Sequence, residues 1–269
     1  MMRLRLLLAY VGTRYSGWQI QEKVDPPPTI QGALEAALRQ ITGVAVRVHG
    51  AGRTDAGVHA HAQVAHCDVP ENRAPRDWRH SCNAVLPKDI RVLAAAPARP
   101  DFHARKDALH KTYVYQFWQE RAFVPPALTP FVWNCGPLDL AALHAALPHL
   151  LGRRDFAGLR NAGTDVEGTV RTVLDARLEP APPCPWYPPH SPMLLFRVTA
   201  DGFLKQMVRN MAGLLAACGQ GKVDPTRIPE LLAARDRRAV PSVTAPAAGL
   251  ALAQVSYETG TLAEGQPQA

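Results

Sequence analysis

Hydrophobic and polar positions alternate, or recur at helical spacing, along most of this chain. Residues 3–10 begin with alternating arginine and leucine, which predicts a strand with one wet and one buried face. After Thr29, apolar residues recur at helical spacing as far as Gly43, so we expect a helix that Thr29 caps and Gly43 ends. The same reasoning predicts further helices over 75–85, 138–151, 203–218 and 226–234, and strands over 44–49, 62–68, 90–98, 111–119, 169–179, 193–200 and 249–257.

Two proline-rich stretches interrupt the pattern. Segment 120–137 contains four prolines and predicts a long loop between two lobes. Segment 180–192 is also proline-rich, so it cannot pair as a central strand and is expected to be an exposed loop. We therefore expect an α+β fold with an N-terminal lobe over 1–119, a connecting loop over 120–137, a C-terminal lobe over 138–258 and a polar tail over 259–269.

Composition narrows the class of protein. The 269 residues are 47% hydrophobic, enough to bury a sizeable core in one large domain or two lobes. Thirty Lys and Arg against 23 Asp and Glu give a net charge of +7, which suits a polyanionic partner. The five cysteines include no CxxC pair, so the sequence indicates neither a zinc site nor a disulfide framework. The apolar start is too short to span a membrane, and we expect a cytoplasmic protein.

The candidate chemistry lies in residues 50–60, GAGRTDAGVHA, directly after a β-branched run. Glycines flank Arg53 and Asp55, so the segment predicts a tight loop that holds both side chains at an open edge. A carboxylate beside a guanidinium is favoured in its charged form and can serve as nucleophile or general base. A bare Asp-Ala-Gly, however, is more often only a turn.

The longer string GRTDAGVHA resembles the active-site motif of the tRNA pseudouridine synthase A family. Other motifs of that family follow in order, and together the resemblance covers about residues 3–258. They are YVGTRYSGWQ at 10–19, NAVLP at 83–87, FHAR at 102–105, KTYVY at 111–115, MVRN at 207–210 and APAAGL at 245–250.

This resemblance implies the pseudouridine synthase fold, in which two related lobes share a mainly antiparallel sheet with flanking helices and an RNA-binding cleft between them. It implies isomerisation of uridines 38, 39 and 40 in the anticodon stem-loop of tRNA. The reaction changes no oxidation state, so no cofactor and no metal are expected. The resemblance further implies a homodimer.

Three catalytic residues are implied by the matching motifs. Asp55 is the expected nucleophile; whether it attacks the ribose C1′ or the uracil C6, or acts through a glycal, stays open. Arg209 is expected to keep Asp55 charged, from a helix on which Lys205 lies four residues earlier and also faces the cleft. Tyr113 is expected to pack on the target uracil and to serve the proton step, whereas Tyr115 is interpreted as a core aromatic residue.

Several basic residues are candidates for RNA contact. Arg53 can occupy the space that a target uridine vacates when it leaves its stack, because a guanidinium both stacks and binds phosphate. Further candidates for phosphate contact are Arg14, Arg105, Lys106, Lys111 and Lys205. Where the family usually has Phe-Ser after FHAR, this chain has Lys106-Asp107, which makes that part of the expected cleft more polar.

Two other functions compete with this interpretation. His59 and His61 form an HxH pair near Asp55, which suggests a metal-dependent hydrolase, although a metal site needs three or more oriented ligands. The second is an RNA-binding protein without catalysis, which would not need a carboxylate at position 55. Neither accounts for the GRTDAG and MVRN matches together with the presence of Asp55.

Overall fold

The computed structural model describes residues 1–22, 24–75, 77–163, 168–181 and 192–258. The chain forms two compact units: unit 1 holds residues 1–111 and the chain from 251 onward, and unit 2 holds residues 112–250. The proline-rich segment 120–137 lies inside unit 2, so this division differs from a boundary placed at that loop. Among the helices of the described residues, none combines the length and the apolar character needed to cross a bilayer.

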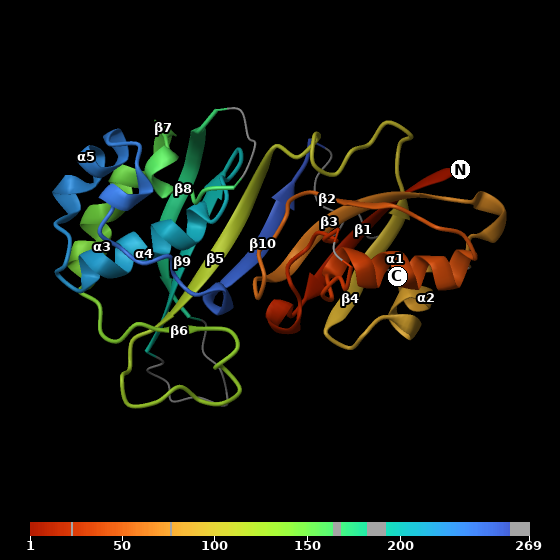
Figure 1. Cartoon of the computed structure of the whole chain (residues 1–269), viewed down its shortest axis with the longest axis horizontal. Coiled ribbons are helices and arrows are strands. Elements are labelled where there is room, and N and C mark those ends of the chain that lie inside the picture. Colours follow the sequence, from red (N-terminus) through yellow and green to blue (C-terminus); the bar gives the residue numbers. More distant parts are fainter. Residues whose placement is uncertain (23, 76, 164–167, 182–191, 259–269) are drawn as a thin grey trace. The chain divides into compact units, whose positions relative to one another are not determined.

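Unit 1 is built on strands that are mainly antiparallel (Figure 1). Its elements are β1 (Met2–Tyr10), α1 (Ile30–Thr42), β2 (Val48–Gly50), β3 (His59–Val69), α2 (Trp78–Val85), β4 (Ile90–Pro97) and most of β10 (Leu250–Ser256). β1 pairs antiparallel with β3 and β4, and β2 pairs antiparallel with β3. β10 returns from unit 2 and pairs with β3 in parallel, and this return makes unit 1 discontinuous in sequence.

The sequence signals of α1 are confirmed. The Thr29 side chain accepts a hydrogen bond from the amide of Gly32, as an N-cap does, and Gly43 ends the helix with a φ of 72°. The adjoining strand is shorter than 44–49 predicts. The Val48 amide donates to the Glu35 carboxylate at 3.0 Å, so a side chain of α1, rather than another strand, takes up this edge.

One expectation for β1 is wrong. Leu4, Leu6 and Leu8 are fully buried, as the alternation predicts, but the opposite face is not simply wet. The Arg5 guanidinium lies 5.2 Å from the ring centre of Phe102 and 4.6 Å from that of Tyr257, as in cation–π contacts. The segment after β4 and the residue after β10 thus cover this face of the strand.

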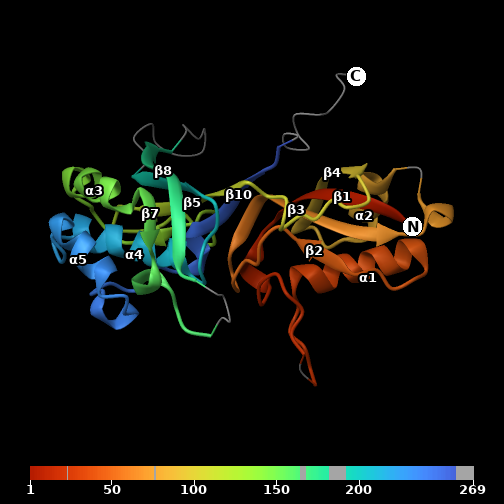
Figure 2. The same ribbon diagram turned by 90° about the horizontal axis from the view of Figure 1, so that it is seen from above.

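Unit 2 combines strands with a group of helices. Its elements are β5 (His110–Trp118), β6 (Trp133–Asn134), α3 (Leu140–Ala146), β7 (Gly152–Asp155), β8 (Val170–Pro180), β9 (Met193–Ala200), α4 (Met207–Gly219) and α5 (Ile228–Ala233). The strands run in the order β5-β9-β8-β7, with β6 paired to β5 in parallel. Figures 1 and 2 show α3, α4 and α5 gathered on one side of these strands.

The α+β fold class and the mainly antiparallel strands are confirmed. The exposed loop predicted over 180–192 falls largely on residues 182–191, and the polar tail predicted over 259–269 falls wholly on residues 259–269. Both of these stretches lie outside the described residues. β7 was missed, because four residues with the sequence GRRD carry no strand periodicity.

Candidate active site

Asp55 lies in the loop between β2 and β3, and the segment that precedes α1 holds the backbone of this loop. The Trp18 amide donates to the Thr54 carbonyl at 3.0 Å, and the Gly57 amide donates to the Tyr15 carbonyl at 3.2 Å. The motifs at 10–19 and 50–60, separate in the sequence, therefore form one structure around Asp55.

Two glycines of segment 10–19 are required by this close approach. A Cβ at Gly12 would lie 2.0 Å from the Val58 carbonyl oxygen. At Gly17 a Cβ would lie 2.6 Å from the Thr54 carbonyl oxygen, and the φ of +88° also favours glycine. Larger residues at either position would push the Asp55 loop away from its support.

The loop is a turn, and it also carries the two candidate side chains, Arg53 and Asp55. The Val58 amide donates to the Asp55 carbonyl at 3.1 Å, so local hydrogen bonding does shape the segment. Asp55 is half-buried, whereas Arg53 is exposed. The turn and the functional interpretation are thus compatible, because the bonds that shape this turn are made by backbone groups.

Tyr113 and Tyr115 lie on β5 in different settings. Tyr113 is buried and meets the Phe203 ring edge-on, with the ring centres 5.1 Å apart. Tyr115 is fully buried, and its hydroxyl donates to the Pro246 carbonyl at 2.8 Å. Burial raises the pKa of Tyr115, so this phenol stays protonated. The interpretation of Tyr115 as a core residue is confirmed.

Arg209 lies in the first turn of α4. Its Nε donates to the Ala245 carbonyl at 2.7 Å, and the Ala245 amide donates to the Arg209 carbonyl at 3.1 Å. A Cβ at Gly213 would lie 1.9 Å from the Val243 carbonyl oxygen, so the helix packs tightly on this segment. The MVRN and APAAGL motifs therefore contact each other and fix the direction of the Arg209 side chain.

The expected geometry of Lys205 is wrong. The helix begins at Met207, after Gln206 with a left-handed φ of 59°, so Lys205 and Arg209 are not successive positions on one helix face. The Lys205 Nζ instead donates to the carbonyls of Ala162 at 2.9 Å and Gly163 at 3.3 Å. The Lys205 ammonium group therefore holds the loop at 162–163 through these two hydrogen bonds.

Arg14 is also engaged. Its guanidinium pairs with Asp89, with Nη2 and Oδ2 2.7 Å apart, and the Tyr15 hydroxyl donates to the same carboxylate at 2.8 Å. The Arg14 side chain is 75% exposed, so water weakens this ion pair. A phosphate that binds Arg14 would have to compete with Asp89.

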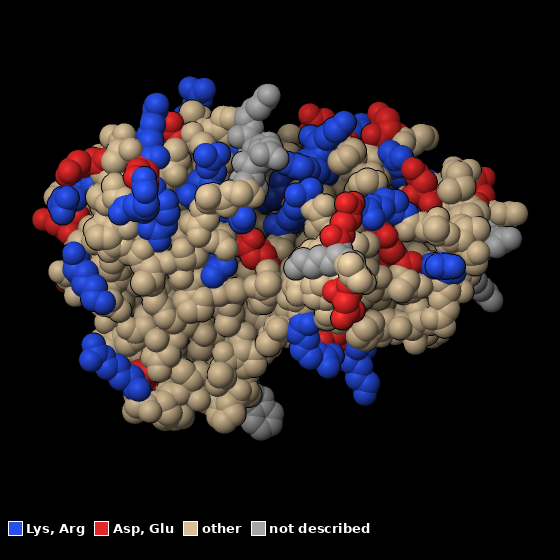
Figure 3. Space-filling model, viewed as in Figure 1, with Lys and Arg blue, Asp and Glu red and all other residues tan. Residues whose placement is uncertain are grey.

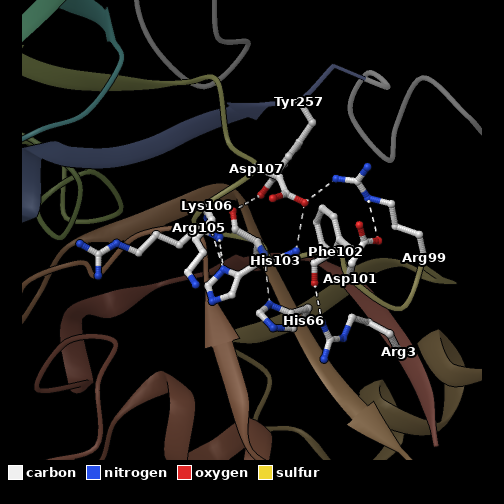
Figure 4. Close-up of polar contacts among 11 residues, drawn as sticks. Arg3, His66, Arg99, Asp101, Phe102, His103, Arg105, Lys106, Asp107 and Tyr257 are labelled. Carbon is white, nitrogen blue, oxygen red and sulfur yellow. Dashed lines mark hydrogen bonds and ion pairs between the residues drawn. The ribbon is translucent and has the colours of Figure 1, made fainter.

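Arg105 projects from a loop whose backbone amides are bonded within unit 1 (Figure 4). The His103 amide donates to the Asp107 carboxylate and the Asp107 amide to the His103 carbonyl, while His103 Nδ1 accepts from the amides of Arg105 and Lys106. The Asp107 carboxylate also accepts from Arg99 at 2.7 Å. Figure 4 shows the Arg105 side chain extending away from the other labelled residues. The loop is thus a rigid base for an exposed cation.

His66 supports the same loop from β3. Its Nδ1 accepts the Ala104 amide at 3.1 Å, and its ring centre lies 4.7 Å from that of His103 and 5.1 Å from that of His49. Burial, with smaller contributions from the nearby His103 and His49, lowers the pKa of His66 to about 4. The neutral ring is the form that can accept this bond.

This arrangement predicts a specific acid sensitivity. Because the folded pKa of His66 lies below its ordinary value of 6.5, the unfolded chain binds the proton more readily as the pH falls from 6.5 to about 4. We expect the titration of His66 to lower the free energy of unfolding by about 2–3 kcal/mol as the pH falls over that interval. His66→Asn keeps an acceptor but does not titrate, so urea unfolding between pH 7 and 4.5 is expected to show a shallower loss for this variant. Equal losses in the two proteins would contradict the prediction.

The HxH pair has a structural role at one position. His59 is buried, and its Nδ1 accepts the Gly12 amide at 3.1 Å, whereas His61 is exposed. Within the described ranges, no group of three or more His, Cys, Asp or Glu side chains is placed to hold a metal ion. The Nδ1 of His59 is thus occupied in supporting segment 10–19.

The candidate residues are divided between the two units. Unit 1 carries Arg14, Arg53, Asp55 and Arg105, and unit 2 carries Tyr113, Lys205 and Arg209. Lys and Arg side chains are present on both units in the face that Figure 3 shows, with Asp and Glu among them. Positive charge is therefore not confined to one half of the chain.

Sequence reasoning missed the residues that support these groups. His66, His103 and Asp107 position the Arg105 loop, and Tyr10 pairs its hydroxyl with that of Thr54 at 2.8 Å. Tyr10 and His103 lie within the matched motifs at 10–19 and 102–105, Asp107 follows the second of these motifs, and His66 lies in no motif. None of these signals identifies the partner of the residue.

Comparison with known proteins agrees with this picture. The family model described as tRNA pseudouridine synthase matches residues 7–106 and 146–258. A tRNA pseudouridine synthase A from Nitratidesulfovibrio vulgaris (strain DSM 19637 / Miyazaki F) is 50% identical, over 96% of this chain and 100% of the relative. Proteins of the same name from Lawsonia intracellularis and Geobacillus kaustophilus are 49% and 40% identical, over 96% and 95% of this chain and 100% and 95% of their own lengths. The chain therefore belongs to the tRNA pseudouridine synthase family, a family of isomerases.

Proposed function

We propose that this protein converts uridine to pseudouridine in tRNA, at positions 38, 39 and 40 of the anticodon stem-loop. Its family membership supports tRNA as the substrate, and the three positions are what the resemblance to tRNA pseudouridine synthase A implies. The observation that carries the proposal is the Asp55 loop, whose backbone is fixed by segment 10–19 while its carboxylate stays half-buried.

The chemistry requires one bond exchange. The C1′–N1 bond breaks, a C1′–C5 bond forms, the C5 proton leaves and N1 gains a proton. No electrons are lost or gained, so no redox cofactor takes part. Asp55 is the proposed nucleophile, at C1′ or at C6, or the base in a glycal route; each route uses the ionised carboxylate.

Arg209 and Tyr113 act on the same nucleotide in this proposal. Arg209 keeps Asp55 ionised and oriented, since a guanidinium favours the charged carboxylate. Tyr113 packs on the uracil and assists the transfer of the C5 proton. The tight packing of α4 supports the role of Arg209, because it holds the arginine backbone in place.

The proposed RNA contacts are Arg53, Arg14, Arg105 and Lys205. Arg53 is exposed at the loop that carries Asp55 and fills the space of the displaced uridine. The other three bind phosphate groups, and the rigid loop beneath Arg105 makes it the best positioned of them. We further propose that the protein is a cytoplasmic homodimer, a state that analytical ultracentrifugation tests directly.

The function is tested by tritium release from tRNA that carries [5-³H]uridine, in the presence of EDTA. Wild-type protein is expected to release tritium, and Asp55→Ala is expected to release none. Chemical derivatisation of pseudouridine followed by primer extension then maps the product, which is expected at positions 38–40. No release from several intact tRNAs would overturn the proposal and favour an RNA-binding protein, whereas product elsewhere would overturn only the positions.

We expect Tyr113→Phe to lower the rate of isomerisation at saturating tRNA by at least about 10-fold while changing the dissociation constant little, since one proton-transfer group typically supplies 10²–10⁴-fold. Tyr115→Phe is the matched control, because it also deletes one phenol hydroxyl from β5 but at a core position. Single-turnover rates and filter binding separate the two effects. A Tyr113→Phe enzyme as fast as wild type would contradict the proton-transfer role.

A further inference from the structure

Unit 2 contains a pocket formed by the chain after β7 and the chain after α5. This pocket has a volume of about 760 Å³. Its lining includes four arginines, Arg160, Arg235, Arg237 and Arg238, and one carboxylate, Asp236, so the net charge of the lining is +3. None of these residues belongs to the catalytic motifs.

No carboxylate of the described residues forms an ion pair with Arg237. Its Nη1 donates to the Val240 carbonyl at 3.0 Å and its Nη2 to the Ser242 carbonyl at 2.6 Å. Its Nε is buried without an acceptor, and so is the Ser242 hydroxyl. Burial also lowers the pKa of Arg237. A half-buried guanidinium that forms no ion pair among the described residues is costly, and a bound anion would offset that cost.

The other arginines are available at the rim. Arg235 pairs with Asp155 at 2.9 Å and Arg238 with Asp236 at 3.1 Å, but their side chains are 69% and 91% exposed. Ion pairs with such exposure are weak and exchange readily with another anion. Arg160 is half-exposed in the lining and forms no ion pair with a carboxylate of the described chain.

The pocket wall adjoins residues already proposed to face RNA. The carbonyl of Ala162, a lining residue, accepts from Lys205 Nζ at 2.9 Å. Asn161, also in the lining, accepts a hydrogen bond from Asn210 of α4 at 2.9 Å. The pocket therefore lies next to the α4 N-terminal turn that carries Arg209 and is built on the same hydrogen-bond network.

We infer that this pocket binds a backbone phosphate of the tRNA, outside the nucleotide that is isomerised. The inference rests on the proposed function, because it assumes that tRNA is the substrate. The planar guanidinium group of arginine can donate two parallel hydrogen bonds to two oxygens of the same phosphate. The pocket is lined by several arginines, so it offers positive charge to a phosphate group of an RNA chain. Each phosphate that is neutralised releases counterions, and this release adds to the affinity for RNA.

The test combines two substitutions at the rim, Arg160→Gln and Arg238→Gln, and leaves Arg237 intact because it holds the loop at 240–242 together. Arg227→Gln is the matched control, an exposed arginine of unit 2 outside the lining. The dissociation constant for unmodified tRNA is measured by filter binding between 50 and 300 mM KCl. We expect the double variant to bind about 10-fold more weakly or worse, and the slope of log K against log salt to fall by about 1 for each lost phosphate contact.

Other results would overturn the inference. If the wild-type enzyme releases tritium from tRNA and the double variant binds with an unchanged constant and slope, the pocket is not an RNA contact even though the function stands. Titration of both proteins with inorganic phosphate alone gives a further arm: loss of phosphate binding in the double variant, with tRNA affinity unchanged, would assign the pocket to a free anion. Failure of the wild type to release tritium refutes the function itself, a different result.

Discussion

Asp55→Asn is expected to abolish pseudouridine formation and to leave tRNA binding within a few-fold of wild type. The carboxamide keeps the shape of the side chain but cannot act as a nucleophile or accept a proton as a base. Removal of a covalent nucleophile typically costs 10⁴-fold or more, so we expect a loss of at least about 1000-fold in single-turnover tritium release. The fold is expected to survive, because the backbone carbonyls of Thr54 and Asp55 accept bonds that fix the loop and the substitution leaves these bonds in place.

The matched control for this variant is Asp101→Asn. Asp101 is an exposed aspartate of unit 1 whose side chain is 79% accessible and pairs with Arg99 at 3.4 Å. It is expected to retain full activity. Thermal unfolding of both variants checks that neither change disturbs the fold. An Asp55→Asn protein with activity within 10-fold of wild type would refute the assignment of the nucleophile.

Local signals predicted the elements that are fixed by local physics. The cap at Thr29 and the glycine at Gly43 defined α1, and the strand expected over 193–200 is confirmed as β9, in which buried and half-buried residues alternate. The start of α4 was missed because Gln206 takes a left-handed φ, which its sequence does not indicate. The partly buried state of Arg5 was missed because Phe102 and Tyr257, which cover it, are distant in sequence.

The candidate site divides in the same way. The motifs led to Asp55, Tyr113 and Arg209 as candidates. The structure explains Gly12 and Gly17 by the close contact between segments 10–19 and 50–60. The supporting groups depend on tertiary contacts: His66 bonds a loop 38 residues later in the chain. The arginine pocket is similar, because its lining comes from two segments more than 70 residues apart that carry no shared pattern.

The second large effect is expected at Arg209. Arg209→Ala removes the Nε donor to the Ala245 carbonyl and the guanidinium that, in our proposal, keeps Asp55 ionised. We expect isomerisation to fall by about 100-fold or more, because a hydrogen-bonded charge that orients the nucleophile is lost. tRNA binding is expected to weaken as well, through the loss of one positive charge at the site.

Arg209→Lys separates charge from geometry at this position. Lysine keeps the positive charge but lacks the planar fork and the Nε donor, so the bond to Ala245 is lost while the attraction to an anion remains. We expect this variant to recover most of the tRNA affinity but only part of the rate. The control for removal of a positive charge elsewhere in unit 2 is Arg227→Ala, since Arg227 is exposed and pairs with Glu230. If Arg209→Lys were as fast as wild type, charge alone would explain the role of Arg209; if Arg209→Ala were also fast, Arg209 would have no part in orienting Asp55.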